Sequence, residues 1–209
     1  MKGAWTTGLL AFALAAGAGH SAAAAGMSFI DRRVHEDTSG VWAAAKSPDF
    51  PAGLTAAAAL GAFWEGGNNR LGKTLWQCLD ADALSGVTTQ ALKLTFQRER
   101  PTQTSDPNEW FKGPHSQSFP SGDVSTVTSL VTPLILEYHD DHPSVYALTA
   151  LPIFDMAARM KAHAHWQSDV LAGAAVGAIS GYLVRKLKTP FILSIMPNGV
   201  AAGLRYRFR

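Results

Sequence analysis

The sequence predicts an all-α protein, a helical bundle that ends in a small C-terminal β-hairpin. After about residue 50, apolar residues recur with helical spacing in several segments, and Gly, Asn, Ser or Pro residues separate these segments. Alternation of apolar and charged residues, which is typical of a strand, occurs in the C-terminal tail. The chain of 209 residues, 47% hydrophobic and 16% charged, suits one globular domain.

Residues 1–25 have the composition of a secretory signal peptide, which predicts an exported, periplasmic protein. Lys2 supplies a positive start, a short apolar run follows, and the segment ends in the small residues that a signal peptidase prefers. Residues 26–209 would then form the mature domain. Its one cysteine, Cys78, can form no intrachain disulfide and is expected to be a buried, small apolar side chain.

The helical core is predicted over about residues 53–187. The residues before it, 28–50, are polar and irregular. Helical patterns then follow, in order, at about 53–64, 71–82, 85–99, 122–138, 143–160 and 166–187. Pro101 is expected to close the third helix, because the residue before a proline disfavours the helical conformation. Polar residues 102–119 form a loop long enough to serve a function rather than a plain connection.

The tail predicts a β-hairpin over about residues 191–208. Asn198 and Gly199 lie between two short extended runs, and this pair favours a tight turn. The second run alternates Leu204, Tyr206 and Phe208 with arginines. We expect a small ribbon packed on the helices.

Charge and hydropathy limit the partners of this domain. A net charge of +2 argues against a nucleic-acid binder. The apolar segments run for about 10 to 15 residues, whereas a membrane-spanning helix needs about 20. These lengths favour a soluble or peripheral protein, and membrane association stays open as an alternative.

Two clusters predict a site for an anion. Lys93 and Arg100 are seven residues apart, which on a helix is two turns less about 20°, so both cations would share one face. Ser121 and Gly122 precede a predicted helix, whose first backbone N–H groups and dipole favour phosphate. The alternatives for these clusters are a solvated basic face and an ordinary N-cap.

A third cluster resembles the parts of a catalytic dyad. His165 and Asp169 lie four apart on a predicted helix, so the carboxylate could accept a hydrogen bond from one ring nitrogen and orient the other outward. Arg159 precedes them and offers a planar fork suited to a phosphoryl group. A structural His and Asp pair is the alternative.

The three clusters, in this order, resemble the signature of the type 2 phosphatidic acid phosphatase family, which includes bacterial acid phosphatases and vanadium haloperoxidases. The resemblance spans residues 93–169. It implies an all-helical bundle and phosphoryl transfer without metal or cofactor. It also implies that His165 attacks phosphorus to form a phosphohistidine and that Asp169 orients His165. The phosphate oxygens would be held by Lys93, Arg100, Ser121, Gly122 and Arg159.

The sequence departs from the family at Asp123, because members usually have a histidine after the Pro-Ser-Gly that protonates the leaving group. Ala158 also stands where a serine is common. A partly buried carboxyl group beside a phosphate dianion is expected to be neutral, so Asp123 could be the general acid. Alternatively His163 or His115 delivers the proton, or the acid is missing.

These observations predict a phosphatase for phosphate monoesters or pyrophosphates, with a lipid or a small periplasmic molecule as substrate. One alternative is a weak or inactive protein that binds phosphate or a lipid headgroup. A second is a vanadate-dependent haloperoxidase. A third is a metallohydrolase whose ligands come from His163, His165, Asp169 and Asp123. The loop at residues 102–119 is a candidate wall for the substrate.

Overall fold

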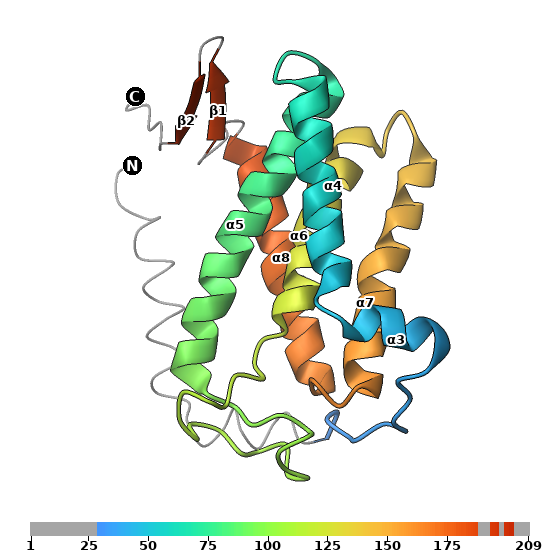
Figure 1. Cartoon of the computed structure of the whole chain (residues 1–209), viewed down its shortest axis with the longest axis vertical. Coiled ribbons are helices and arrows are strands. Elements are labelled where there is room, and N and C mark those ends of the chain that lie inside the picture. Colours follow the sequence, from blue (N-terminus) through green and yellow to red (C-terminus); the bar gives the residue numbers. More distant parts are fainter. Residues whose placement is uncertain (1–28, 188–192, 197–198, 203–209) are drawn as a thin grey trace.

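The computed structural model describes residues 29–187, 193–196 and 199–202 of the chain. The predicted signal peptide therefore lies outside the described residues. The elements are α3 (Gly40–Lys46), α4 (Asp49–Glu65), α5 (Arg70–Phe96), α6 (Gly122–Tyr138), the 3₁₀ helix η1 (Pro143–Thr149), α7 (Ala150–Lys161), α8 (Gln167–Leu187), β1 (Leu193–Met196) and β2 (Gly199–Ala202) (Figure 1). The prediction of an all-α core is confirmed for the described residues.

Helices α5, α6 and α8 form the centre of the bundle, and α4 and α7 flank them (Figure 1). Strands β1 and β2 pair antiparallel, with Met196 opposite Gly199. The residues between the two strands, and those after β2, lie outside the described residues. Cys78 is fully buried, as predicted, and burial raises the pKa of its thiol to about 12.

Glycines on α8 bring this helix unusually close to α6. A Cβ added at Gly173 would lie 2.4 Å from the carbonyl oxygen of Ser121, and one added at Gly177 would lie 2.4 Å from that of Ser125. Gly181 repeats the spacing one turn later, against Thr132. Because only hydrogen fits at these positions, the two backbones are in direct contact. The start of α6 is thereby fixed beside the start of α8.

Helix α5 corrects two predictions. It runs without a break through residues 83–84, where two helices were predicted, and Ser85 is buried and hydrogen-bonded to Ser125 of α6. It ends at Phe96 rather than before Pro101. Gln97 takes a left-handed conformation with φ of 41°, and its N–H caps the carbonyl of Lys93. A tertiary contact therefore accompanies the continuity of α5 through residues 83–84, and a local cap marks its end at Phe96.

Two other boundaries differ from prediction. The segment predicted as one helix at 143–160 is a 3₁₀ turn followed by α7, and residues predicted to be irregular contain α3. Among the described helices, α8 alone is long and apolar enough to cross a membrane by length and composition, and 33% of its apolar window is buried. The core helix of a soluble bundle also meets this criterion.

Candidate active site

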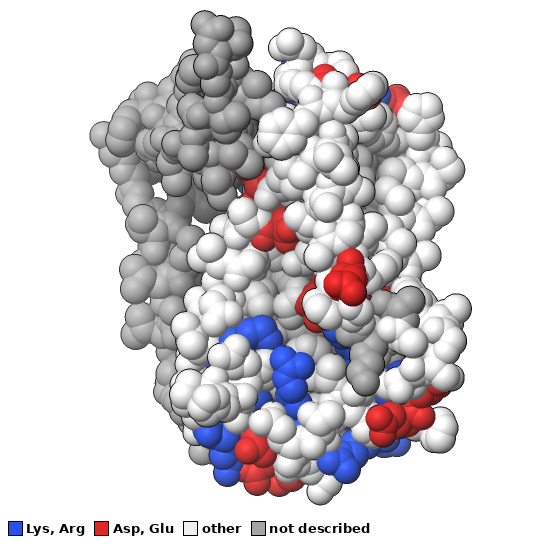
Figure 2. All heavy atoms as spheres, in the orientation of Figure 1, with Lys and Arg blue, Asp and Glu red and all other residues white. Residues whose placement is uncertain are grey.

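The predicted site residues meet at the end of the bundle where α5 and α7 end and α6 and α8 begin (Figure 1). The loop that joins α5 to α6 lies at this end as well. Lysine and arginine side chains gather on this part of the surface, and acidic side chains lie both above and among them (Figure 2). Antiparallel neighbours thus bring together residues from distant parts of the chain.

Two cations converge on one backbone carbonyl. Lys93 lies in the last turn of α5, and its Nζ donates to the carbonyl oxygen of Gln117 at 2.6 Å. The guanidinium of Arg100 donates to the same oxygen at 3.4 Å and to the carbonyl oxygen of Ala164 at 3.2 Å. The prediction that both share a helical face is wrong, because the helix ends at Phe96. They meet because the chain turns back after the helix.

Burial changes the acid–base behaviour of these cations. Loss of water around Lys93 lowers the pKa of its ammonium to about 8, and the charge of Arg100 acts in the same direction. The carboxylates of Asp169 and Asp123 oppose this shift in the pKa of Lys93. A lysine at such a site is a strong anion ligand only while it keeps its proton.

The start of α6 provides backbone donors next to these cations. Ser121 precedes the helix, its backbone N–H donates to the carbonyl oxygen of Asp169 at 2.9 Å, and its side chain makes no cap hydrogen bond. The buried Ser121 Oγ has no hydrogen-bond partner among the described residues. A Cβ at Gly122 would lie 3.7 Å from Cε of Lys93. The start of α6 therefore lies beside the lysine side chain, and the first N–H groups of a helix favour an anion.

Arg159 is held by two carboxylates. It lies in the last turn of α7, where Nε contacts Asp155 Oδ1 at 3.2 Å and Nη1 contacts Asp123 Oδ2 at 3.0 Å. Asp155 is fully buried, and its burial raises the pKa of its carboxyl group to about 6. Sequence reasoning missed Asp155, although its place four residues before an arginine on the same helix was visible. Asp123 thus fills one side of the fork that phosphate would use.

The His165 and Asp169 pair forms at the start of α8 and not within a helix as predicted. His165 precedes the helix, Asp169 lies in its first turn, and 3.8 Å separates Nδ1 from Oδ2. His165 is buried, and loss of water lowers the pKa of its ring. Asp169 opposes this shift, whereas Arg100 and Lys93 add to it. The ring is therefore neutral near pH 7, the state that a nucleophile requires.

Asp169 is fixed by further donors. Its Oδ1 accepts from Arg98 at 2.6 Å, and its Oδ2 accepts from the Ser118 hydroxyl at 2.5 Å and from the Trp166 backbone at 2.9 Å. Burial would raise the pKa of Asp169, but the nearby His165 ring, Arg98 and the Ser118 hydroxyl outweigh it and hold the pKa below its usual range. The carboxylate facing His165 therefore stays ionised.

A second carboxylate, that of Asp31, binds the other terminal nitrogen of Arg98. Asp31, in the segment before α3, contacts Nη2 of Arg98 at 2.6 Å and accepts from both the backbone and the hydroxyl of Ser168 at 2.8 and 2.7 Å. The side chains of Asp31 and Arg98 are 0% and 1% exposed. Sequence reasoning missed this network, because no spacing rule connects residues so far apart in the chain.

The N-terminal segment also accounts for one candidate proton donor. The ring nitrogen Nε2 of His163 lies 2.8 Å from the carbonyl oxygen of Val34, which turns this ring toward the segment. Arg33 of the same segment donates to the carbonyl oxygens of Pro101 and Thr104. His115 is exposed on the loop between α5 and α6. The structure therefore places Asp123 beside Arg159, and it ties His163 to residues outside this cluster.

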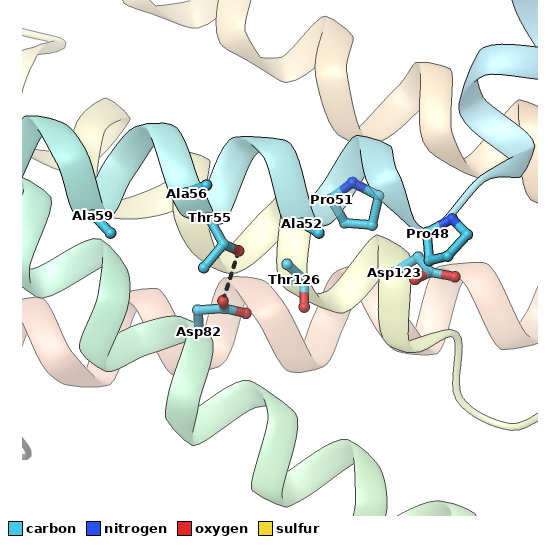
Figure 3. Close-up of a pocket in the computed structure, with 9 residues that line it drawn as sticks. All are labelled: Pro48, Pro51, Ala52, Thr55, Ala56, Ala59, Asp82, Asp123 and Thr126. Atoms are coloured by element: carbon cyan, nitrogen blue, oxygen red, sulfur yellow. Dashed lines mark hydrogen bonds between the residues drawn. The ribbon is translucent and has the colours of Figure 1, made fainter.

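A groove of about 460 Å³ leads away from Asp123 (Figure 3). Helix α4 forms one wall, and α5 and α6 form the other. The residues that line it are Pro48, Pro51, Ala52, Thr55, Ala56, Ala59, Asp82, Asp123 and Thr126. Within the described residues, no group of three His, Cys, Asp or Glu side chains is arranged to hold a metal ion.

Comparison with known proteins matches this site to a family. Residues 74–192 match the model of the PAP2 superfamily. Over 122 residues the chain is 34% identical to the lipid A 1-phosphatase of Porphyromonas gingivalis. The aligned region covers 57% of this chain and 25% of that protein. The chain thus matches about a quarter of that relative's length. The crystal structure of Aquifex aeolicus LpxE aligns with 67% of this chain and 87% of its own at 23% identity, with a TM-score of 0.48.

Proposed function

This chain belongs to the PAP2 superfamily, and from that premise we propose that it is an exported phosphatase that hydrolyses phosphate monoesters of a lipid through a phosphohistidine, without a metal ion. The relative named as a lipid A 1-phosphatase supports the choice of a lipid substrate. Pyrophosphates and small soluble esters share the same phosphoryl chemistry.

The observation that best supports this proposal is the meeting of His165 with positive charge. Lys93 and Arg100 lower the pKa of the His165 ring, so both lie within electrostatic reach of it. The N-terminus of α6 adds backbone donors beside Lys93. Phosphoryl transfer requires mainly positive charge around the equatorial oxygens and a nucleophile in line with the leaving group.

The reaction would proceed in two steps. In the first, Nε2 of His165 attacks phosphorus, the bond from phosphorus to the leaving oxygen breaks, and the leaving alkoxide takes a proton. Asp169 keeps the other ring nitrogen oriented and offsets the positive charge of the phosphohistidine. In the second, water attacks phosphorus, the bond to Nε2 breaks, and inorganic phosphate leaves. In this scheme the carboxyl group of Asp123 gives its proton to the leaving alkoxide in the first step and takes a proton from water in the second.

Asp123 can serve as this acid if substrate binding releases it from Arg159. The two side chains form an ion pair of 3.0 Å. A substrate phosphate competes for the same guanidinium. Once Arg159 turns to the phosphate, Asp123 has lost its cation and faces an anion, and both changes favour the neutral acid. We infer that Asp123 becomes the proton donor only when substrate phosphate binds Arg159.

The test is hydrolysis of an aryl phosphate and of a lipid phosphate by the full chain, with chelator present. We expect turnover that resists chelator and falls by about 10³-fold or more in His165→Ala, because loss of a nucleophile has effects of that size. The matched control is His142→Ala, an exposed histidine at the other end of α6, which should keep wild-type rates.

Two results would contradict the proposal. Turnover retained by His165→Ala would exclude the phosphohistidine. Turnover abolished by chelator and restored by a divalent ion would exclude the metal-free route. Binding of inorganic phosphate with no turnover on either ester would instead identify the chain as a phosphate-binding protein. The contacts of Arg159 with both Asp123 and Asp155 favour this alternative.

A further inference from the structure

The groove beside the candidate active site contains a carboxylate that phosphoryl transfer does not use. Asp82 projects from α5 toward α4, and its Oδ2 accepts the Thr55 hydroxyl at 3.0 Å (Figure 3). The hydroxyls of Thr126 and Ser129 of α6 bond to it as well. No ion pair joins Asp82 to a cationic side chain of the described residues. Asp82 is therefore a half-buried acid whose known partners are hydroxyl groups.

This environment leaves the charge of Asp82 uncompensated. Burial raises the pKa of its carboxyl group, and the bonds from Thr126, Thr55 and Ser129 offset the effect only in part. Removing an ionised carboxylate from water without a counter-ion costs free energy. A carboxylate has about four acceptor positions, so the three hydroxyl groups leave room for one more donor. A cationic group in the groove would supply what the chain does not.

The composition of the groove also favours a cation. Its nine lining residues include two carboxylates, two threonines and five prolines or alanines, with no lysine or arginine among them. Lys93 and Arg100 contact the backbone carbonyls of Gln117 and Ala164, which do not line the groove, and Arg159 contacts Asp123. The site is thus positive at the phosphate end and negative along the groove.

The distance between the two ends limits the ligand. Asp123 and Thr126 are three residues apart on α6, which is about 4.5 Å along the helix axis. Asp82 bonds to Thr126, so a group held by Asp82 would lie about 5 to 10 Å from phosphorus held beside Asp123. Alanines and prolines make the intervening wall narrow and apolar, which suits a few methylene groups.

We propose that the groove is a subsite for the leaving group, in which Asp82 binds an ammonium group, and that the preferred substrate is a phosphate monoester whose alcohol carries an amine. The inference rests on the proposed phosphatase activity and adds the class of alcohol to it. The amine keeps its proton throughout, and the alcohol leaves by the two steps described above.

The test compares kcat/KM for aminobutyl, hydroxybutyl and butyl phosphate. We expect the wild-type protein to prefer aminobutyl over butyl phosphate by about tenfold or more, the usual size of a charged hydrogen bond. In Asp82→Asn, which keeps the shape of the side chain, this ratio should fall close to one. The ratio is taken within each variant, so a general loss of activity does not affect it. Aminoethyl and aminohexyl phosphate then measure the preferred length.

Two variants serve as controls. Asp140→Asn removes an acid whose side chain is 87% exposed and outside the groove, and it should keep the wild-type ratio. Ala56→Leu narrows the groove from the α4 wall and should lower kcat/KM for butyl and aminobutyl phosphate relative to methyl phosphate. A steric effect of Ala56→Leu without any amine preference would show that the groove holds the alcohol but that Asp82 does not select it.

Three results would overturn the inference. The first is equal kcat/KM for aminobutyl and butyl phosphate in the wild type. The second is a ratio that Asp82→Asn leaves unchanged. The third is equal preference for hydroxybutyl phosphate, which would assign Asp82 to a neutral donor. Binding to His165→Ala, measured by calorimetry, separates the two proposals, since tighter binding of aminobutyl than of butyl phosphate would support the subsite even if the wild type hydrolyses neither.

Discussion

At the residue scale, one guanidinium is shared by two carboxylates behind His165. Arg98 contacts both Asp31 and Asp169 at 2.6 Å, and all three side chains are at most 1% exposed. One positive charge offsets only one of the two negative charges, so the cluster of Asp31, Arg98 and Asp169 keeps a net negative charge. That charge would stabilise the positive ring of a phosphohistidine. Asp31 therefore prevents Arg98 from neutralising Asp169.

We predict that Asp31→Asn lowers kcat about tenfold, equivalent to about 1.4 kcal/mol, with little change in KM. Asparagine can still accept from Ser168, but Arg98 would then offset Asp169 fully. Steady-state kinetics on a lipid phosphate checks this split, and thermal unfolding checks that the variant is folded.

The matched control is Asp37→Asn, in the same N-terminal segment. Asp37 pairs with Lys161 at 3.5 Å, outside the network of Arg98. A rise in KM with kcat unchanged in Asp31→Asn, or equal losses in both variants, would contradict a role for Asp31 in the charge balance.

The pKa of Lys93 predicts a pH dependence. Burial lowers this pKa to about 8, so the ammonium loses its proton, and with it its attraction for phosphate, as the pH rises through about 8. We expect kcat/KM to fall above this pH. In Lys93→Arg the fall should move to much higher pH, because a guanidinium stays charged. An unchanged alkaline limb in Lys93→Arg would assign that limb to another group.

At the element scale, direct contact between α6 and α8 positions the proposed phosphate site. Gly177 allows this contact, since a Cβ there would lie 2.4 Å from the backbone oxygen of Ser125. We predict that Gly177→Ala lowers the free energy of unfolding by about 1 to 3 kcal/mol, as overpacking a close contact does. Urea unfolding measures the change.

Gly86 offers the opposite control. It lies within α5, and an added Cβ would meet no atom within 4 Å. Gly86→Ala should raise the free energy of unfolding by about 0.5 to 1 kcal/mol, because alanine loses less backbone entropy in a helix. Similar losses in both variants would show that helix propensity, and not close packing, explains the effect at Gly177.

The helices themselves were largely predictable, and their ends were not. The apolar spacing of α6 and α8 identified both within a residue of their observed bounds. The break predicted near residue 84 does not exist, because Ser85 is buried against α6 rather than exposed in a turn. Gln97 ends α5 in a left-handed conformation, which a glutamine in the sequence does not predict. Periodicity shows which face is apolar, whereas helix ends depend on contacts made elsewhere.

At the scale of the whole molecule, the sequence predicted which motif residues would meet, and it missed their partners. The motifs include Lys93, Arg159 and His165 because phosphate chemistry needs those side chains at those spacings. Asp31 and Asp82 belong to no motif. Their roles follow from the packing of the N-terminal segment and of α4 against the bundle, and spacing along the chain carries no information about such contacts.

The contact between Asp31 and Ser168 also has a consequence for the order of synthesis. These residues are 137 positions apart, so the ribosome makes one of them early and the other near the end of the described helices. A partly synthesised chain cannot form this contact, and it lacks His165 and Asp169 as well. The growing polypeptide therefore lacks the complete candidate active site until translation of the bundle is nearly finished.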